Sequence, residues 1–140
     1  MKLHTTNYFN TFIEIAEDCP IDFGHIPVSG REKKTVAEKQ YDLIAKHPYK
    51  YTSDEVVFQI FAESSDLHSS EYEQARERFF SKGQPCLRTS PLGKRYGFGI
   101  HFNAEGRMAL YGAESDEYRQ CSADPAVKKL KAVRSTRKQL

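Results

Sequence analysis

The stretch FFSKGQPCLRTSPLGKRYGFGIHFNAEGRMALY, residues 79–111, holds the clearest alternation in the chain. Apolar side chains at every second position would share one face of a strand: Tyr96, Phe98, Ile100 and Phe102. The positions between them would form the other face: Arg95, Gly97, Gly99 and His101. Residues 103–106 end in glycine and fit a four-residue turn into a return strand over residues 108–112. The stretch therefore predicts a β-hairpin with its aromatic face in the core.

A second strand is predicted near the N-terminus, at residues 8–16, YFNTFIEIA. This segment is rich in aromatic and β-branched residues, which favour strands. Thr11, Ile13 and Ile15 would lie on one face and Phe12 on the other. Because apolar residues occur on both faces, we expect this strand to lie in the interior of the sheet.

Three helices are predicted between this strand and the hairpin, because three segments combine a helical apolar stripe with a start signal. The signal is the capping-box spacing, a Thr or Ser followed three residues later by a Glu. It occurs at Thr35 and Glu38, at Thr52 and Glu55, and at Ser70 and Glu73. We expect a left-handed cap at Gly83 to end the third helix. Asp124 followed by Pro125 predicts the start of a further, C-terminal helix.

These elements indicate an α+β fold. A small antiparallel sheet, made of the N-terminal strand and the late hairpin, would be covered by about three central helices and a C-terminal helix. A chain of 140 residues is long enough for one domain with its own core. We assign residues 1–127 to a single globular α+β domain and residues 128–140 to a basic, partly frayed C-terminal tail.

Charge is distributed unevenly along the chain. Residues 128–140 hold six of the 21 basic groups and no acid, so residues 1–127 carry 15 basic and 19 acidic groups, a net charge of −4. A mildly acidic body argues against the domain as a platform for nucleic acid. Binding of nucleic acid through the basic tail is an alternative.

The cysteines and histidines show no arrangement typical of a metal site. Cys19, Cys86 and Cys121 form neither a CxxC pair nor a Cys/His spacing, and the five histidines are scattered singly. We therefore predict no metal ion and no cofactor. An odd number of cysteines without a signal peptide indicates a reducing compartment, and no apolar run approaches the length of a membrane span. We expect a cytoplasmic protein with no membrane partner.

The candidate site lies in the loop and strand over residues 84–101. Five side chains there could contact a ligand: Cys86, Arg88, Lys94, Arg95 and His101. Arginine offers a planar fork of donors and lysine a point charge, so we expect an anionic small molecule or a protein partner, bound without catalysis. Gly97 and Gly99 would give the open face of the sheet a shallow floor. The plainer interpretation is a set of solvated charges beside an exposed strand.

A small enzyme is the alternative function. It would use Cys86 or His101 as the reactive group and Arg95 as an electrophilic stabiliser, and the thiol would need a base in contact with it. A role for Cys86 in packing is the simpler interpretation. Tyr49 and Tyr51 could stack on a base, or could anchor the link between two helices to the core. An exposed edge strand could also pair two copies into a homodimer.

Several longer phrases resemble one known family: TTNYFNTFIEIAEDCP, HPYKYTSDEVVFQIFA, FFSKGQPCLRTSPLGKRYGFGIHF and EGRMALYG. It is a microbial family of uncharacterised, short, single-domain proteins, classed as a domain of unknown function. The resemblance extends over nearly the whole chain to about Tyr118 and leaves out the basic tail. It implies a single self-contained domain, and it carries over no activity, cofactor or catalytic residue.

Overall fold

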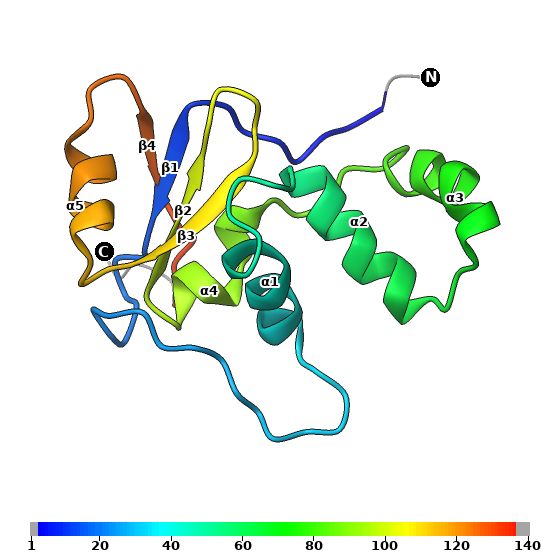
Figure 1. The fold of residues 1–140 in the computed structure, drawn as a ribbon, viewed down its shortest axis with the longest axis horizontal. Coiled ribbons are helices and arrows are strands. Elements are labelled where there is room, and N and C mark those ends of the chain that lie inside the picture. The colour runs from blue at the N-terminus through cyan, green and yellow to red at the C-terminus, as the bar shows by residue number, and fades with distance from the viewer. Residues whose placement is uncertain (1–2, 137–140) are drawn as a thin grey trace.

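A four-stranded mixed sheet forms the centre of the α+β fold (Figure 1). The computed structural model describes residues 3–136. The strands of the sheet are β1 (Thr11–Glu14), β2 (Phe98–Phe102), β3 (Met108–Gly112) and β4 (Lys128–Lys131). They lie in the order β3-β2-β1-β4, with β1 antiparallel to β2 and parallel to β4. The N-terminal strand and the hairpin are confirmed, whereas the fourth, parallel strand makes the sheet mixed and not antiparallel.

Strand β1 occupies the interior of the sheet, as its two apolar faces predict. Phe12 and Ile13 are 0% and 1% exposed, although the strand spans only four residues. Ile13 pairs with Ile100 of β2 and belongs to the main core, while Phe12 pairs with His101 and faces the opposite side. The sheet is therefore buried on both faces along its central strands.

Five helices accompany the sheet: α1 (Val36–Ala45), α2 (Ser53–Ser64), α3 (Tyr72–Phe79), α4 (Pro91–Lys94) and α5 (Asp116–Ala123). Helices α1 and α4 lie on one side of the sheet and α5 on the other (Figure 1). Helices α2 and α3 extend away from the sheet as a helical arm (Figure 1). Two 3₁₀ turns, Ser69–Glu71 and Leu87–Thr89, precede α3 and α4.

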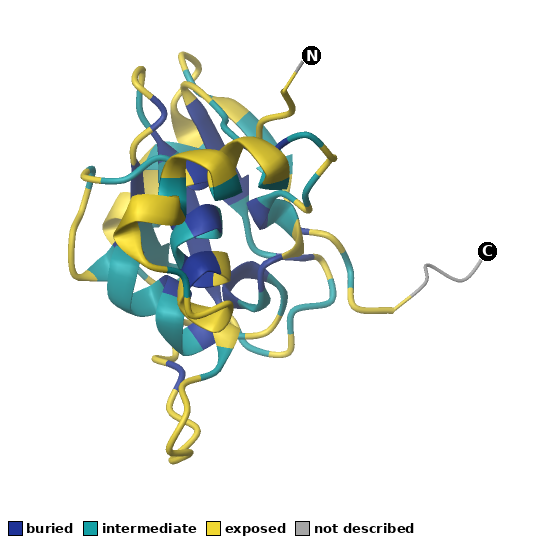
Figure 2. Cartoon of the chain, turned by 90° about the vertical axis from the view of Figure 1, so that its right-hand side faces the viewer, coloured by how far each residue is buried: buried dark blue, intermediate teal, exposed yellow. Residues whose placement is uncertain are grey.

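Apolar burial divides into two clusters. The main core joins the sheet to α1 and α2 through side chains that are almost fully buried: Ile13, Ile44, Val56, Leu87, Ile100, Phe102 and Met108. A smaller cluster between α2 and α3 contains Phe58, Ala62 and Phe80. Figure 2 shows the buried residues gathered inside the molecule, with exposed residues on the outer surfaces of the helices and on the loop tips.

Two of the three predicted capping boxes are confirmed. Thr35 and Thr52 each accept the backbone N–H of the glutamate three residues later, and that glutamate accepts the backbone N–H of the threonine. The box expected at Ser70 is wrong, because Ser70 lies within the 3₁₀ turn before α3 and no side chain caps that helix. The left-handed cap expected at Gly83 is also wrong, because α3 already ends at Phe79, its C-cap residue Phe80 has a φ of −85°, and Gly83 has no positive φ.

The predicted C-terminal helix is wrong, and residues 128–131 form β4 instead. Asp124 Oδ1 accepts the backbone N–H of Ala126 at 2.9 Å, a local turn that replaces the helix start. Lys128 N then donates to Asn10 O and Ala132 N to Glu14 O, both at 2.8 Å, so the segment completes the open side of β1. The predicted boundary at residue 128 thus coincides with the first residue of a strand.

Two carboxylates hold the segment after β4: Glu17 pairs with Arg134 at 3.0 Å, and Asp18 contacts the next two residues. Asp18 accepts the backbone N–H groups of Ser135 and Thr136 and the Thr136 hydroxyl, at 2.9–3.2 Å. These hydrogen bonds lower the pKa of Asp18 below its ordinary value. Within the predicted frayed tail, Ser135 and Thr136 are therefore hydrogen-bonded to the body of the domain, and residues 137–140 lie outside the described residues.

Candidate functional site

Arg88 stabilises the edge of β4 through its Nε and its backbone carbonyl. Its Nε donates to Lys131 O at 2.8 Å, and its own carbonyl accepts the N–H of Val133 at 2.8 Å. Lys128 and Ala132 direct their N–H groups toward β1, so Lys131 O and Val133 N point to the outer side of the strand. One arginine thus satisfies two backbone groups of an edge strand.

The other two basic residues of the predicted site lie beside α4. Lys94 is half-buried at the last position of that helix, and Arg95 is exposed at the position after it. The backbone N–H of Arg95 donates to Pro91 O, which closes the turn. Arg95 does not share a strand face with His101, because β2 begins only at Phe98.

Cys86 and His101 lie on opposite sides of the sheet. Cys86 lines a cavity with residues of α1 and α2, whereas His101 alternates with the core residues Ile100 and Phe102 and faces the α5 side. Each is hydrogen-bonded to a tyrosine: Tyr8 Oη donates to Cys86 Sγ at 3.1 Å, and Tyr49 Oη lies 2.9 Å from His101 Nδ1. The structure does not bring the two together as a thiol–imidazole pair.

Gly97, just before β2, and Gly99, within it, do not form an open floor, which corrects the expected ligand-facing surface. Gly97 has a φ of 75°, and a Cβ at this position would collide with the backbone of Phe23. A Cβ at Gly99 would collide with the rings of Phe12 and Tyr118, which pack edge to face at 4.9 Å between centroids. Both glycines are needed for close packing within the chain, so neither is available to a ligand.

Three titratable side chains instead form a chain of hydrogen bonds on the α5 side. Tyr49 Oη lies 2.9 Å from His101 Nδ1 and 2.7 Å from Tyr111 Oη. Burial lowers the pKa of His101, against the effect of the Asp124 charge. Burial and the hydrogen bond to Tyr111 raise the pKa of Tyr49 well above its ordinary value. The neutral forms of His101 and Tyr49 are therefore favoured at pH 7.

Tyr49 reaches this position because of its backbone. It has a φ of 58°, a left-handed conformation that is uncommon outside glycine, and its N–H donates to Met108 O at the edge of β3. Its side chain then lies on the far side of the sheet from α1. The sequence suggested that this tyrosine could anchor the link between two helices to the core; its hydroxyl meets His101 on the α5 side instead, a partner 52 residues away that no spacing rule connects to it.

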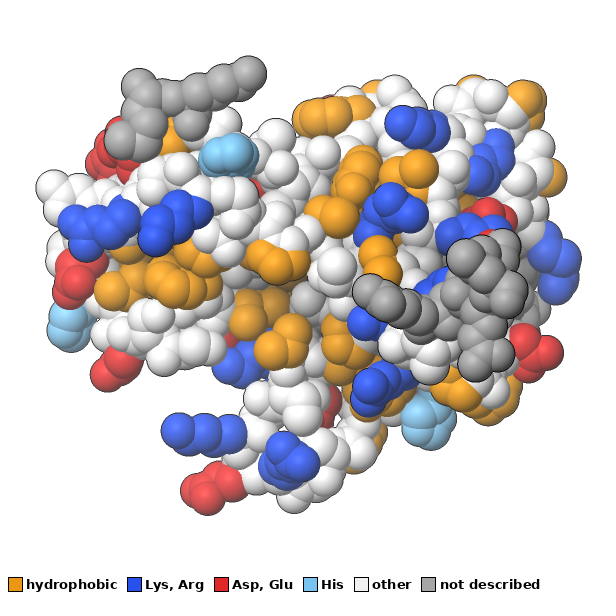
Figure 3. Space-filling model, turned by 180° about the vertical axis from the view of Figure 1, so that it is seen from behind, with side chains coloured by type: hydrophobic (Ala, Val, Ile, Leu, Met, Phe, Trp, Pro, Cys, Tyr) orange, Lys and Arg blue, Asp and Glu red, His pale blue; other side chains and the backbone are white. Residues whose placement is uncertain are grey.

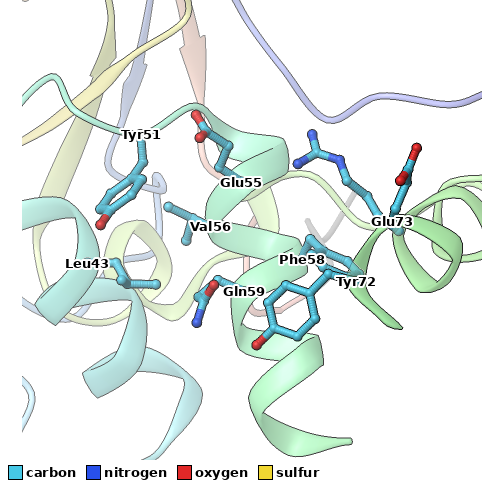
Figure 4. Close-up of a pocket in the computed structure, with 9 residues that line it drawn as sticks. Leu43, Tyr51, Glu55, Val56, Phe58, Gln59, Tyr72 and Glu73 are labelled. Carbon is cyan, nitrogen blue, oxygen red and sulfur yellow. The ribbon is translucent and has the colours of Figure 1, made fainter. Parts of the chain in front are cut away.

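A cleft lined by apolar, aromatic and charged side chains lies between α1, α2 and α3 (Figure 4). Its volume is about 410 Å³. Nine residues line it: Leu43, Tyr51, Glu55, Val56, Phe58, Gln59, Tyr72, Glu73 and Arg76. Figure 4 shows Leu43 contributed by α1, Val56 and Gln59 by α2, and Tyr72 by α3. Sequence reasoning missed this cleft because it depends on how three separate helices pack.

Aromatic packing fixes the α3 side of the cleft. The rings of Phe58 and Tyr72 lie edge to face with centroids 5.7 Å apart, and Phe58 contacts Phe79 in the same way at 5.9 Å. The guanidinium of Arg76 lies over the Phe80 ring, 5.5 Å from its centroid. Glu55 is positioned by its capping role, since its Oε1 accepts both Thr52 donors. The polar groups of the cleft are therefore held by the helices that carry them.

Elsewhere on the surface, the apolar side chains do not gather into one large patch. Seen from behind, they form several patches separated by polar atoms and by Lys and Arg side chains (Figure 3). The most exposed apolar side chains in the loop between β1 and α1 are Phe23, Ile26 and Val28, at 45%, 52% and 79%. In residues 3–136, no group of three or more His, Cys, Asp or Glu side chains is placed to hold a metal ion.

Comparison with known families assigns the chain to a family, but that family has no assigned activity. A model of a family of unknown function, DUF6157, matches residues 3–138. The chain belongs to DUF6157. This match confirms the resemblance to an uncharacterised single-domain family, and it includes the segment that forms β4. No curated protein and no solved structure matches the chain.

Within residues 3–136 of this DUF6157 member, no helix combines the length and the apolar character needed to cross a bilayer. The longest helix, α2, has 12 residues.

Proposed function

We propose that this protein is a non-catalytic binding domain that holds a small amphipathic organic molecule in the cleft between α1, α2 and α3. The cleft itself is the observation that carries the proposal. Its volume of about 410 Å³ lies in the range of roughly 300–1,000 Å³ that is usual for small-molecule pockets. A lining of apolar and aromatic side chains with a few fixed polar groups is also typical of such sites.

The lining favours a ligand with an apolar body. Leu43, Val56 and Phe58 offer aliphatic and aromatic surface, and Tyr51 and Tyr72 add two further rings. Removing apolar area from water contributes about 25 cal/mol per Å², so a single ligand ring packed here would supply most of the binding free energy. The cleft is lined by residues of three helices, and its shape is largely formed without a ligand.

The charges favour a cationic group on that ligand. Two carboxylates, Glu55 and Glu73, line the cleft against one guanidinium, and Arg76 already lies over the ring of Phe80. Aromatic faces next to carboxylates attract amines through both the ring quadrupole and Coulomb interaction. The expected anionic ligand of the 84–101 loop has less support, because the Nε of Arg88 there already donates to Lys131 O.

The first prediction uses the lack of tryptophan in this chain. Tyr72→Trp places a single fluorophore at the cleft, and Phe23→Trp places one on a loop residue that does not line it. We expect 2-phenylethylamine to change the tryptophan fluorescence of Tyr72→Trp up to a saturating concentration. The fluorescence of Phe23→Trp should stay unchanged. We expect 3-phenylpropionate, which has a similar ring and the opposite charge, to bind at least about fivefold more weakly, the effect of roughly 1 kcal/mol.

Glu73→Gln in the Tyr72→Trp background tests the role of charge. Removing this carboxylate should weaken 2-phenylethylamine and bring the two probes closer in affinity. Equal responses of the two tryptophan reporters, or tighter binding of the carboxylate probe, would contradict the proposal.

A further inference from the structure

The outer edge of β4 offers backbone groups that no other strand uses. The strand lies at the end of the sheet order, and within residues 3–136 it pairs only with β1. Successive backbone groups of a strand point to opposite sides, and the N–H groups of Lys128 and Ala132 donate to β1. The groups of Lys129 and Lys131 therefore point outward. Three of them have no hydrogen-bond partner in the described part of the chain: Lys129 N–H, Lys129 C=O and Lys131 N–H.

Arg88 limits the open part of this edge to residues 129–131. Its Nε donates to Lys131 O and its carbonyl accepts the N–H of Val133, so it takes the place of a partner strand at that end. A second folded copy would bring the whole edge of its own sheet against Arg88. A single extended peptide is narrow enough to pair with residues 129–131 alone. The geometry therefore favours a peptide over a second copy of this chain.

The surface next to the open edge is positively charged. A groove of about 550 Å³ runs beside the end of β4, and it is lined by three cations and a single carboxylate: Arg88, Lys131, Arg134 and Glu17. Glu17 already pairs with Arg134 at 3.0 Å. Lys131 is exposed and forms no ion pair within residues 3–136, and of the Arg88 guanidinium only Nε has a hydrogen-bond partner there. Two cations are left without a counter-charge, which favours an acidic partner.

The backbone groups and the charges together narrow the kind of partner. A peptide backbone supplies acceptors for the two N–H groups and a donor for Lys129 O, whereas the phosphates of a nucleic acid only accept. The last residues of this chain are unsuited, because Arg137 and Lys138 have the same charge as the groove. Successive side chains of β4 lie on opposite faces of the sheet, with Lys131 on one and the core residue Leu130 on the other. A segment that alternates acidic and apolar residues therefore fits this edge.

We propose that the outer edge of β4 binds an acidic, extended segment of a partner protein, which adds a short strand beside residues 129–131. The backbone of that segment would complete the hydrogen bonds of Lys129 and Lys131. Its carboxylates would lie next to the Lys131 ammonium and the free nitrogens of the Arg88 guanidinium. Binding of this kind takes its affinity from main-chain hydrogen bonds and its specificity from alternate side chains.

The first test compares fluorescein-labelled hexapeptides with blocked ends, and measures their binding to the full chain by fluorescence anisotropy. A peptide that alternates glutamate and valine should bind with saturation. It should bind at least about tenfold more tightly than a peptide that alternates lysine and valine, because every charge is reversed. No saturation up to about 1 mM of the glutamate peptide, or equal affinities of the two peptides, would overturn the proposal.

Methylation of the peptide backbone separates strand pairing from charge. The glutamate–valine peptide with a methyl group on every backbone nitrogen keeps its carboxylates and loses its N–H donors. It should bind at least about tenfold more weakly, since it cannot donate to Lys129 O and its methyl groups prevent close approach. Equal affinity would mean that charge alone holds the peptide, and would contradict the added strand. Tighter binding of fluorescein-labelled hexathymidylate would assign the surface to nucleic acid and would also rule out the proposal.

Lys131→Gln locates the site on the chain. Removing this charge should weaken binding of the glutamate–valine peptide about threefold, the effect of one exposed ion pair. Lys82→Gln is the matched control, because Lys82 is exposed in the segment after α3 and should leave the affinity unchanged. Equal effects of the two substitutions would place the peptide elsewhere, and a dimeric wild-type chain would give the edge to a second copy; either result refutes the assignment. The proposal is independent of ligand binding in the cleft between α1, α2 and α3.

Discussion

His101 shows how a single side chain can acquire a different role from the one its neighbours in sequence suggest. It lies one position after Ile100 and one before Phe102, both 0% exposed, and so it faces away from the main core. There its partners are Tyr49, whose hydroxyl meets Nδ1, and Phe12, whose ring centroid lies 6.4 Å from that of the imidazole. The imidazole is positioned by aromatic and hydroxyl groups and not by the basic loop that precedes the strand.

The pH dependence of stability follows from this environment. Burial lowers the pKa of His101 in the folded state below the value of about 6.5 for an unfolded chain. As the pH falls through 6.5, the unfolded chain binds a proton before the folded one does. The free energy of unfolding should therefore decrease as the pH falls from 6.5 to the folded-state pKa of His101. Above pH 6.5 the stabilising contribution of the neutral imidazole should be complete.

NMR titration of the five imidazole C–H resonances, with urea unfolding at matched pH values, measures this effect. His68→Gln is the control substitution, because that side chain is exposed. A titration midpoint for His101 at or above 6.5 would contradict the expected direction.

At the scale of single elements, β4 differs most from what its sequence suggests. The segment KKLK reads as a solvated basic tail, but Leu130 pairs with Ile13 and packs against the main core. Arg88 then covers part of the outer side of the strand. The element is thus stabilised by partners from three distant parts of the chain.

A pair of substitutions distinguishes a packed strand from a tail. Leu130→Ala should lower the free energy of unfolding by about 1–3 kcal/mol, less than a fully buried leucine would, because this side chain is half-buried. Lys128→Ala in the same strand is exposed and should change it by less than about 0.5 kcal/mol. Urea unfolding monitored by circular dichroism measures both, and equal small effects would mean that β4 contributes no packing.

Local signals predicted the elements that depend on local chemistry. The capping boxes of α1 and α2 need only residues three apart, and the alternation of β2 needs only the chain itself. The prediction for residues 128–131 was wrong because this segment becomes a strand by pairing with β1, and its own residues carry no local signal of that pairing. The capping box predicted at Ser70 was wrong although its signal is local, because residues 69–71 form a 3₁₀ turn and Ser70 does not cap α3.

The candidate site was harder to predict because its chemistry depends on contacts between distant residues. Cys86 was predicted as a possible ligand contact and lines a cavity, but its partner Tyr8 lies 78 residues away and Gln40 of the same cavity comes from α1. Arg88 was recognised as a basic residue, while its carbonyl partner lies 43 residues further along the chain. Residue type was therefore predictable and hydrogen-bond partnership was not.

At the scale of the whole molecule, both edges of the sheet are partly covered. Met108 of β3 uses its carbonyl for Tyr49 N and its N–H for Tyr51 O, which blocks that edge at its start. Arg88 occupies the far end of the β4 edge. Since open strand edges favour pairing between copies, this arrangement disfavours the edge-to-edge homodimer that the sequence suggested.

Association in solution tests this view of the edges. The wild-type chain should sediment as a monomer of 16.1 kDa at micromolar concentration. Arg88→Ala frees the carbonyl of Lys131 and should give a dimer that increases with concentration. Arg95→Ala removes the same charge from an exposed position and should remain monomeric. Identical sedimentation of the two variants would show that Arg88 does not protect the edge.

The parallel pairing of β1 with β4 has a consequence for biosynthesis. The ribosome releases β1 long before β4, although the two strands are neighbours in the finished sheet. Until residues 128–131 have been made, Phe12 and Ile13 have no strand on one side, and the nascent chain exposes an apolar edge. The sheet can close only after β4 has been synthesised, so a chain stalled before residue 128 should depend on chaperones that a chain containing β4 does not need.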